Sequence, residues 1–161
     1  DGNVMSVLDG IVELGFDVNV ADHRMAFARR EHFPGASRVV VCNPERLAET
    51  VDPDDGSIVL VMSHSYANDR AYLRTLLMRS FIYLGLLGPR QRSERILAEL
   101  AKEGIEPSSE LRARLHAPAG LDIGAETPEE IALSILSEIR AELAARSGGR
   151  LRDRNAPIHG G

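Results

Sequence analysis

Short apolar runs alternate with amphipathic segments along the chain. Four of these runs predict strands, and most of the four are continuous and rich in Val, Ile and Leu, which is typical of parallel strands covered on both faces. The predicted strands lie at residues 17–22, 38–43, 57–63 and 81–88. Apolar positions at helical spacing predict helices at residues 4–14, 44–50, 68–78, 93–102, 108–115 and 128–145, with a short helical turn at 25–30. This alternation predicts an α/β fold with a Rossmann-like, doubly wound parallel sheet in a three-layer α/β/α arrangement.

One domain accounts for most of the 161 residues. We assign residues 1–146 to the Rossmann-like domain, and residues 147–161, which lack periodicity, to an extended C-terminal arm. A Rossmann unit starts with a strand and a glycine turn before its first helix, whereas the first helical pattern here follows Gly2 almost at once. We therefore expect the first strand and most of the glycine turn to lie upstream of residue 1.

Charge and cysteine content argue against several classes of protein. A formal net charge of −5 argues against a nucleic-acid-binding protein, because the phosphate backbone favours clustered positive charge. No apolar run reaches the roughly 18 residues that a transmembrane helix needs, so no membrane span is expected. Cys42 is the single cysteine, which excludes an internal disulfide and suits a reducing, cytoplasmic compartment.

Asp22 lies at the end of a predicted strand, twenty positions after Gly2. An acid at that place in a dinucleotide-binding unit accepts hydrogen bonds from the ribose hydroxyls. Arg24 could instead favour a 2′-phosphate, so the choice between NAD and NADP stays open. The alternative interpretation, that Asp22 caps the following turn, has about equal weight.

Ser63 and His64 follow the third predicted strand. Ligands of open α/β sheets bind outside the carboxyl ends of the strands, so His64 is well placed for acid–base work or for holding an anion. A single histidine after a strand is more often a structural residue, and spacing alone favours that alternative.

Residues 85–95 combine two glycines with a group of arginines. Gly85 and Gly88 allow the backbone to approach a ligand closely. Arg90 and Arg92 lie where a helix should begin, although the helix dipole favours acids there, and binding of an anion or phosphate would compensate. The alternative is a solvated helix face on which charged residues pair at i,i+4 spacing.

Residues 116–130 lead into the longest predicted helix. Thr127 as N-cap and Glu130 three residues later form a capping box, which makes this helix start a poor phosphate site. His116 and Asp122 lie in the preceding loop and are candidates for contact with a ligand. Cysteine and histidine spacing predicts no zinc site, and the sequence assigns no catalytic residue.

Several motifs together resemble the XdhC/CoxI family of accessory factors for xanthine dehydrogenase. They lie at residues 20–24, 61–64, 83–90, 116–138, 147–154 and 157–159. The resemblance implies the Rossmann-like C-terminal domain of that family. It further implies a non-catalytic accessory protein, or chaperone, that binds the molybdenum cofactor (molybdopterin), supports its sulfuration with a cysteine desulfurase and delivers it to an apo molybdenum hydroxylase.

Two functional hypotheses follow. In the first, the chain binds a pterin-phosphate cofactor through residues 85–95, with His64, His116 and Asp122 around the same crevice. In the second, it is an NAD(P)-dependent oxidoreductase whose dinucleotide contacts Gly2 and Asp22. A third alternative is an interaction scaffold that has the fold but no longer uses the ligand site. A tail that can exchange with a neighbouring copy would also allow a homodimer.

Overall fold

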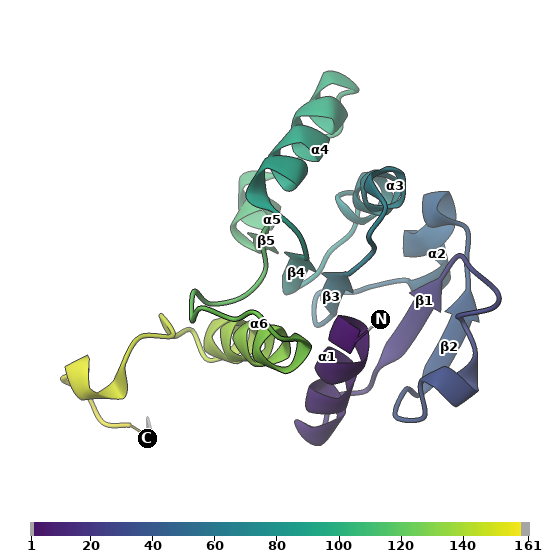
Figure 1. Ribbon diagram of the computed structural model, residues 1–161. Coiled ribbons are helices and arrows are strands. Elements are labelled where there is room, and N and C mark those ends of the chain that lie inside the picture. The colour runs from purple at the N-terminus through teal and green to yellow at the C-terminus, as the bar shows by residue number, and fades with distance from the viewer. Residues whose placement is uncertain (1, 159–161) are drawn as a thin grey trace.

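The computed structural model describes residues 2–158 and has the predicted α/β architecture, with parallel strands between helices (Figure 1). Residue 1 and residues 159–161, the end of the predicted arm, lie outside the described residues. The strands are β1 (Asn19–Asp22), β2 (Arg38–Val41), β3 (Ile58–Val61), β4 (Tyr83–Leu86) and β5 (Leu115–His116). The α-helices are α1 (Gly2–Glu13), α2 (Leu47–Val51), α3 (Tyr66–Leu76), α4 (Arg90–Lys102), α5 (Ser109–Ala113) and α6 (Pro128–Leu143). The 3-10 helices are η1 (Arg30–His32), η2 (Pro44–Arg46) and η3 (Leu151–Asp153).

The strands pair in two parallel groups. β1 pairs with β2, and β3, β4 and β5 pair in that order. All four residues of β4 are buried, as expected of an inner strand with helices on both faces. Within the described residues, β1 and β3 do not pair with each other.

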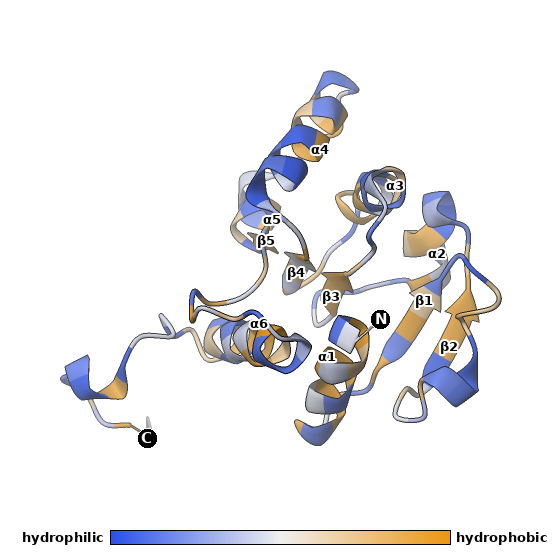
Figure 2. Cartoon of the chain, viewed as in Figure 1, coloured by the Kyte–Doolittle hydropathy of each residue, from blue (hydrophilic) through white to orange (hydrophobic). Residues whose placement is uncertain are grey.

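Helices form the two outer layers. α1 and α6 pack together on one side of the strands, while α2, α3 and α4 lie on the other (Figure 1). The apolar residues face inwards, and the outer surface of α4 is strongly hydrophilic (Figure 2). The larger core lies under α3 and α4 and includes the fully buried Leu73, Leu76, Phe81, Leu84, Ile96 and Leu100. No helix among the described residues is both long and apolar enough to cross a membrane.

Three predicted helices differ in detail from the structure. The short helical turn predicted at residues 25–30 is a turn at residues 25–27, where the Phe27 and Ala28 amides bond to the Arg24 carbonyl, and η1 follows it. α4 begins at Arg90, three residues before the prediction, because Pro89 provides an extended N-cap. The helix predicted to end at Leu115 ends at Ala113, and β5, a strand of two residues, follows it.

Candidate functional site

The parallel strands end at one edge of the molecule, where a large cavity opens. The cavity has a volume of about 1320 Å³ and continues inwards between β1 and β3. Four of the residues predicted as ligand-binding line it: Asp22, Arg24, Ser63 and His64. These four residues therefore lie around one space near the carboxyl ends of the strands, which is where open α/β sheets bind ligands.

Asp22, at the end of β1, is held by Arg24. The Arg24 backbone N–H and Nε donate to Asp22 Oδ1 at 2.8 and 3.0 Å, and Nη2 donates to Oδ2 at 2.8 Å. Burial disfavours the charged carboxylate, but the hydrogen bonds and charge of Arg24 outweigh it and lower the pKa of Asp22 below its ordinary value. A ribose hydroxyl would therefore compete with Arg24 for the Asp22 oxygens.

His23 joins this edge to α3, through two residues that sequence reasoning did not select. Its Nε2 lies 3.4 Å from Asn68 Nδ2, and its Nδ1 lies 3.5 Å from the Tyr72 hydroxyl. Burial, together with the nearby Asp22 charge, raises the pKa of Tyr72 to about 12, so its hydroxyl stays protonated at neutral pH. The signal for both residues in the sequence is their i,i+4 spacing in α3, the helix that follows the end of β3.

Ser63 and Arg92 meet at a buried carboxylate, Asp69, in the first turn of α3. Ser63 Oγ donates to Asp69 Oδ1 at 2.5 Å, and Arg92 Nη2 donates to Asp69 Oδ2. Arg92 Nη2 also lies 3.3 Å from the Ser63 carbonyl oxygen, which it contacts as a donor. Burial raises the pKa of Asp69, and Ser63 and Arg92 offset part of that rise. Arg92, predicted as an anion contact, thus has a buried ionic partner within the protein.

The remaining residues of the predicted phosphate segment differ in their surroundings. A side chain at Gly85 would clash with Leu60 and Tyr83, so close packing within the sheet requires glycine there. Gly88 adopts a φ of +125°, which favours glycine in the turn between β4 and α4. Arg90 is exposed and its Nε donates to Glu94 Oε1 at 2.7 Å, an i,i+4 pair on the helix surface.

His116 belongs to a separate cluster under α6. Its ring stacks on Tyr83 with a centroid distance of 4.3 Å, and its Nδ1 lies 3.3 Å from Glu138 Oε1. Glu138 Oε2 accepts hydrogen bonds from the Tyr83 hydroxyl at 2.6 Å and from the Gly120 N–H at 2.7 Å. Burial and the Glu138 carboxylate raise the pKa of Tyr83. The signal for Glu138 in the sequence is an acid at the helical spacing of the apolar residues Ile131 and Ile135.

The structure therefore divides the predicted site residues into groups. Asp22, Arg24, Ser63 and His64 share the cavity, and Arg92 contacts its wall through Ser63. His116 faces α6 instead, and neither it nor the exposed Asp122 lines the cavity. Gly2 begins α1, where a side chain would contact Pro128.

Comparisons with known proteins agree with this architecture. The family model described as XdhC Rossmann domain matches residues 4–139. The chain is 35% identical over 129 residues to a probable xanthine dehydrogenase subunit of Bacillus subtilis (strain 168), covering 79% of the chain and 36% of that protein. It is 38% identical over 127 residues to "Uncharacterized protein YqeB" of Escherichia coli (strain K12), covering 78% of the chain and 23% of that protein.

A solved structure gives the same result at the level of the fold. The crystal structure of a xanthine dehydrogenase from Bacillus halodurans matches with a TM-score of 0.77 and 27% identity. The match covers 96% of this chain and 42% of that chain. The chain thus spans between 23% and 42% of the length of these three proteins.

Proposed function

This chain belongs to the XdhC family through its Rossmann domain, and from that premise we propose that it serves as part of an accessory factor for a molybdenum hydroxylase of the xanthine dehydrogenase type. The observation that carries the proposal is the family match over residues 4–139, which includes every residue that we place at the carboxyl edge. The names of two similar proteins, which refer to xanthine dehydrogenase, point to the same client class.

The ligand that we propose for the edge is the molybdenum cofactor. When bound, that group supplies the molybdenum centre whose sulfuration activates the client enzyme. The residues along the cavity suit its oxo and pterin groups, because Arg24, His64 and Asn68 offer nitrogen donors around the opening. We assign these residues the task of binding and orienting the cofactor, and we assign no chemical step to them.

The start of α4 is the place that we propose for the cofactor phosphate. Among the described residues, no side chain caps this helix start and no acid lies in its first turn. Gly88 has no side chain to keep a phosphate away from the backbone, and the exposed Arg90 supplies positive charge. α6 is the opposite case, because Thr127 and Glu130 cap its first turn and make it negative.

Calorimetric titration of the chain with molybdenum cofactor tests the proposal. We expect saturable binding, and we expect Arg90→Ala to weaken it about tenfold, the effect of one charged hydrogen bond. Arg95→Ala is the matched control, because Arg95 lies on the same helix, is similarly exposed and pairs with Glu99 at i,i+4 as Arg90 pairs with Glu94. Equal affinities for the two variants would contradict the phosphate assignment. Absence of cofactor binding would contradict the proposal that molybdenum cofactor is the ligand.

A second candidate function, NAD(P)-dependent oxidoreduction, is favoured by one observation. Asp22 ends β1 beside the cavity, twenty residues after Gly2, as a ribose-binding acid would. The same titration with NAD and NADP separates the candidates. Dinucleotide binding that Asp22→Asn abolishes, without binding of molybdenum cofactor, would replace the accessory proposal with this one.

The partners that we propose are the apo molybdenum hydroxylase and a cysteine desulfurase, with a homodimer as the assembly of the chain itself. Each partnership has its own measurement. Co-purification with the apo enzyme tests the client, co-purification with the desulfurase tests the sulfur source, and sedimentation velocity tests the dimer. A chain that sediments as a monomer at every concentration would contradict the dimer alone.

A further inference from the structure

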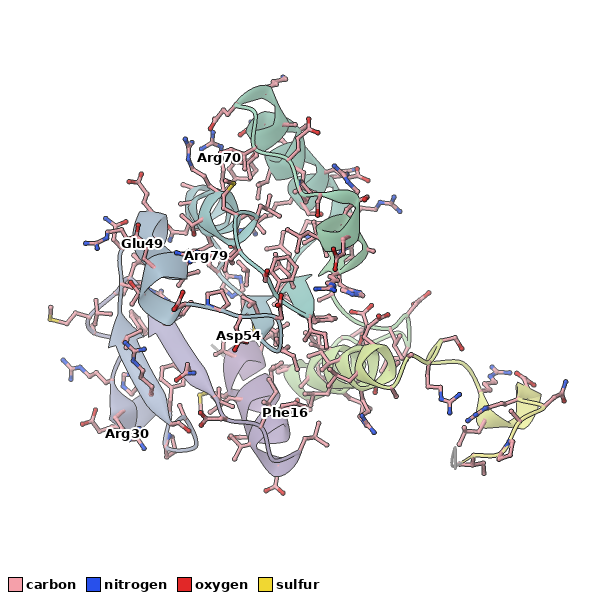
Figure 3. The ribbon with its side chains drawn as sticks, turned by 180° about the vertical axis from the view of Figure 1, so that it is seen from behind. Phe16, Arg30, Glu49, Asp54, Arg70 and Arg79 are labelled. Atoms are coloured by element: carbon pink, nitrogen blue, oxygen red, sulfur yellow. The ribbon has the colours of Figure 1, made fainter. Side chains whose placement is uncertain are left out.

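The arm that follows α6 projects away from the rest of the chain. Gly148 still lies beside Leu121 and Ala141 at the end of α6, since an added side chain would meet both. Beyond it, the arm runs on the side of α6 away from α1, as the two opposite views agree (Figure 1 and Figure 3). None of residues 147–158 is buried, and all but Arg154 are exposed. The arm's own copy therefore leaves its surface uncovered.

The arm nevertheless has local structure. η3 forms a turn at Leu151–Asp153, and Arg154 Nη1 donates to the Ile158 carbonyl oxygen at 3.3 Å. Leu151 and Ile158 are each 62% exposed. Residues 150–154 contain three arginines and one acid, so the arm is positively charged. A segment with exposed aliphatic side chains and positive charge is suited to a surface that is both apolar and acidic.

A groove lies between α1 and α6. Gly2 of α1 lies against Pro128 of α6. Gly10 lies against Leu136, so the two helices run side by side in the same direction. The groove that opens between them has a volume of about 410 Å³. It is lined by Ser6, Asp9, Glu129, Ala132, Leu133 and Leu136.

The chemistry of the groove complements that of the arm. Leu133 is 58% exposed and gives the groove an apolar side chain that its own copy does not cover. Asp9 and Glu129 are exposed in the same lining and make no ion pair with any other described residue. Arg150 of the arm also has no ionic partner within the described part of the chain. Opposite charges that stay unpaired within one copy can pair between two copies.

The course of the arm indicates which copy it contacts. It leaves from the last turn of α6, whereas Glu129 and Leu133 lie in the first half of that helix. It also runs on the side of α6 away from α1, and so away from the groove of its own copy (Figure 1). In a pair related by two-fold symmetry, each arm can reach the groove of the other, and the same contact is made twice.

We propose that the groove between α1 and α6 binds residues 150–158 of the arm from a second copy of this chain, and that the exchange is reciprocal. Leu151 packs on Leu133, and the arginines of the arm pair with Asp9 and Glu129. The proposal names the contact surface of the homodimer proposed above and rests on that dimer. It is independent of the ligand that we assign to the cavity.

Sedimentation velocity of two single variants and of their mixture tests the proposal. Leu133→Asp alters the groove and leaves the arm intact, whereas Leu151→Asp does the reverse. We expect each variant alone to raise the dimer dissociation constant about 100-fold, because a two-fold dimer loses both contacts and each loss is about tenfold. An equimolar mixture should form dimers at concentrations at which neither variant does so alone, because one copy supplies a native arm and the other a native groove.

The control carries the same change at an exposed apolar residue outside the groove. Met78 is exposed and lies just after α3, in the other helical layer, so Met78→Asp should leave the dimer dissociation constant unchanged. Leu133→Ala and Leu151→Ala add no charge and form a second pair of variants if either aspartate variant does not fold.

Four results would overturn the proposal in different ways. A mixture that behaves like the single variants would show that the arm does not cross to a second copy. Loss of the dimer in Leu133→Asp but not in Leu151→Asp would show that the groove packs on helices of the second copy. Dimers that persist in both variants would contradict this surface and leave the proposed dimer standing. A parent chain that is monomeric at every concentration would contradict the surface and the dimer together, and the cofactor titration would still test the proposed ligand.

Discussion

The two halves of the molecule use similar apolar strands with different results. In the half built on β3, β4 and β5, all four residues of β4 are buried, and Leu84 is completely buried. In the half built on β1 and β2, Val20 is only partly buried and Val41 is 47% exposed. The difference shows that an apolar strand is completely buried only where it has a paired strand on each side and helices on both faces.

The largest difference between the halves should appear in the cost of removing a core side chain. Leu84→Ala in β4 creates a cavity in a closed core, and we expect it to lower the free energy of unfolding by about 2–5 kcal/mol. Val20→Ala in β1 removes a partly exposed side chain, and we expect a loss of about 1 kcal/mol. Urea denaturation of both variants measures the difference, and equal losses would show that the halves are packed equally well.

The second prediction concerns the ion pair between Arg92 and the buried Asp69, which lies in the half built on β3, β4 and β5. Arg92→Ala leaves the fully buried Asp69 without its cation, and we expect a loss of about 3 kcal/mol. Arg90→Ala, which removes an exposed arginine from the same helix turn, is the control and should cost less than about 0.5 kcal/mol. Thermal unfolding of both variants provides the comparison. A small effect at Arg92 would mean that water enters to solvate Asp69.

The third prediction compares the tyrosine hydroxyl in the cluster under α6 with the one beside the cavity. Tyr83→Phe removes a 2.6 Å hydrogen bond to Glu138, and we expect it to lower the free energy of unfolding by about 1–2 kcal/mol. The Tyr72 hydroxyl lies 3.5 Å from His23, so Tyr72→Phe should cost less than about 0.5 kcal/mol. Chemical denaturation measures both values. A larger loss of stability for Tyr72→Phe would mean that the hydroxyl beside the cavity, and not the one under α6, makes the stronger hydrogen bond.

The smallest predicted effect depends on pH. Because the folded-state pKa of Asp22 is lowered, its ionised form stabilises the fold above the unfolded-state pKa, and this contribution is lost as the pH falls through the folded-state pKa. Arg24→Gln should therefore cost less than about 1 kcal/mol at pH 7, with the difference from the parent chain vanishing in acid. Stability measured from pH 7 to pH 2 tests this, with Arg29→Gln as the charge control. A difference that persists below the folded-state pKa would mean that Arg24 acts through its contact with Phe27.

Much of the fold could be predicted because its signals are local. Three of the four longer strands, β2, β3 and β4, follow continuous apolar runs, and the capping box of Thr127 and Glu130 forms as predicted. β5 was missed, because two residues are too few to establish a period. The pairing of the strands was not predicted either, because it depends on which strands are neighbours in space.

The candidate site was partly predictable for a similar reason. Asp22 and His64 were found because both directly follow strands, and strand ends share an edge. Arg92 was interpreted as an available cation at a helix start, because its partner Asp69 lies 23 residues away in the sequence. Glu138 was overlooked because no sequence pattern shows that its carboxylate meets Tyr83, 55 residues away.

The contact of Asp69 with Ser63 and Arg92 has a mechanical consequence. It fastens the end of β3, the first turn of α3 and the first turn of α4 at one point, so that these three elements resist displacement together. Across the opening, His23 lies 3.4 Å from Asn68 Nδ2 and 3.5 Å from the Tyr72 hydroxyl, so its contacts with α3 are long and weak. We therefore expect the Ser63 side of the ligand edge to be held more rigidly than the Asp22 side.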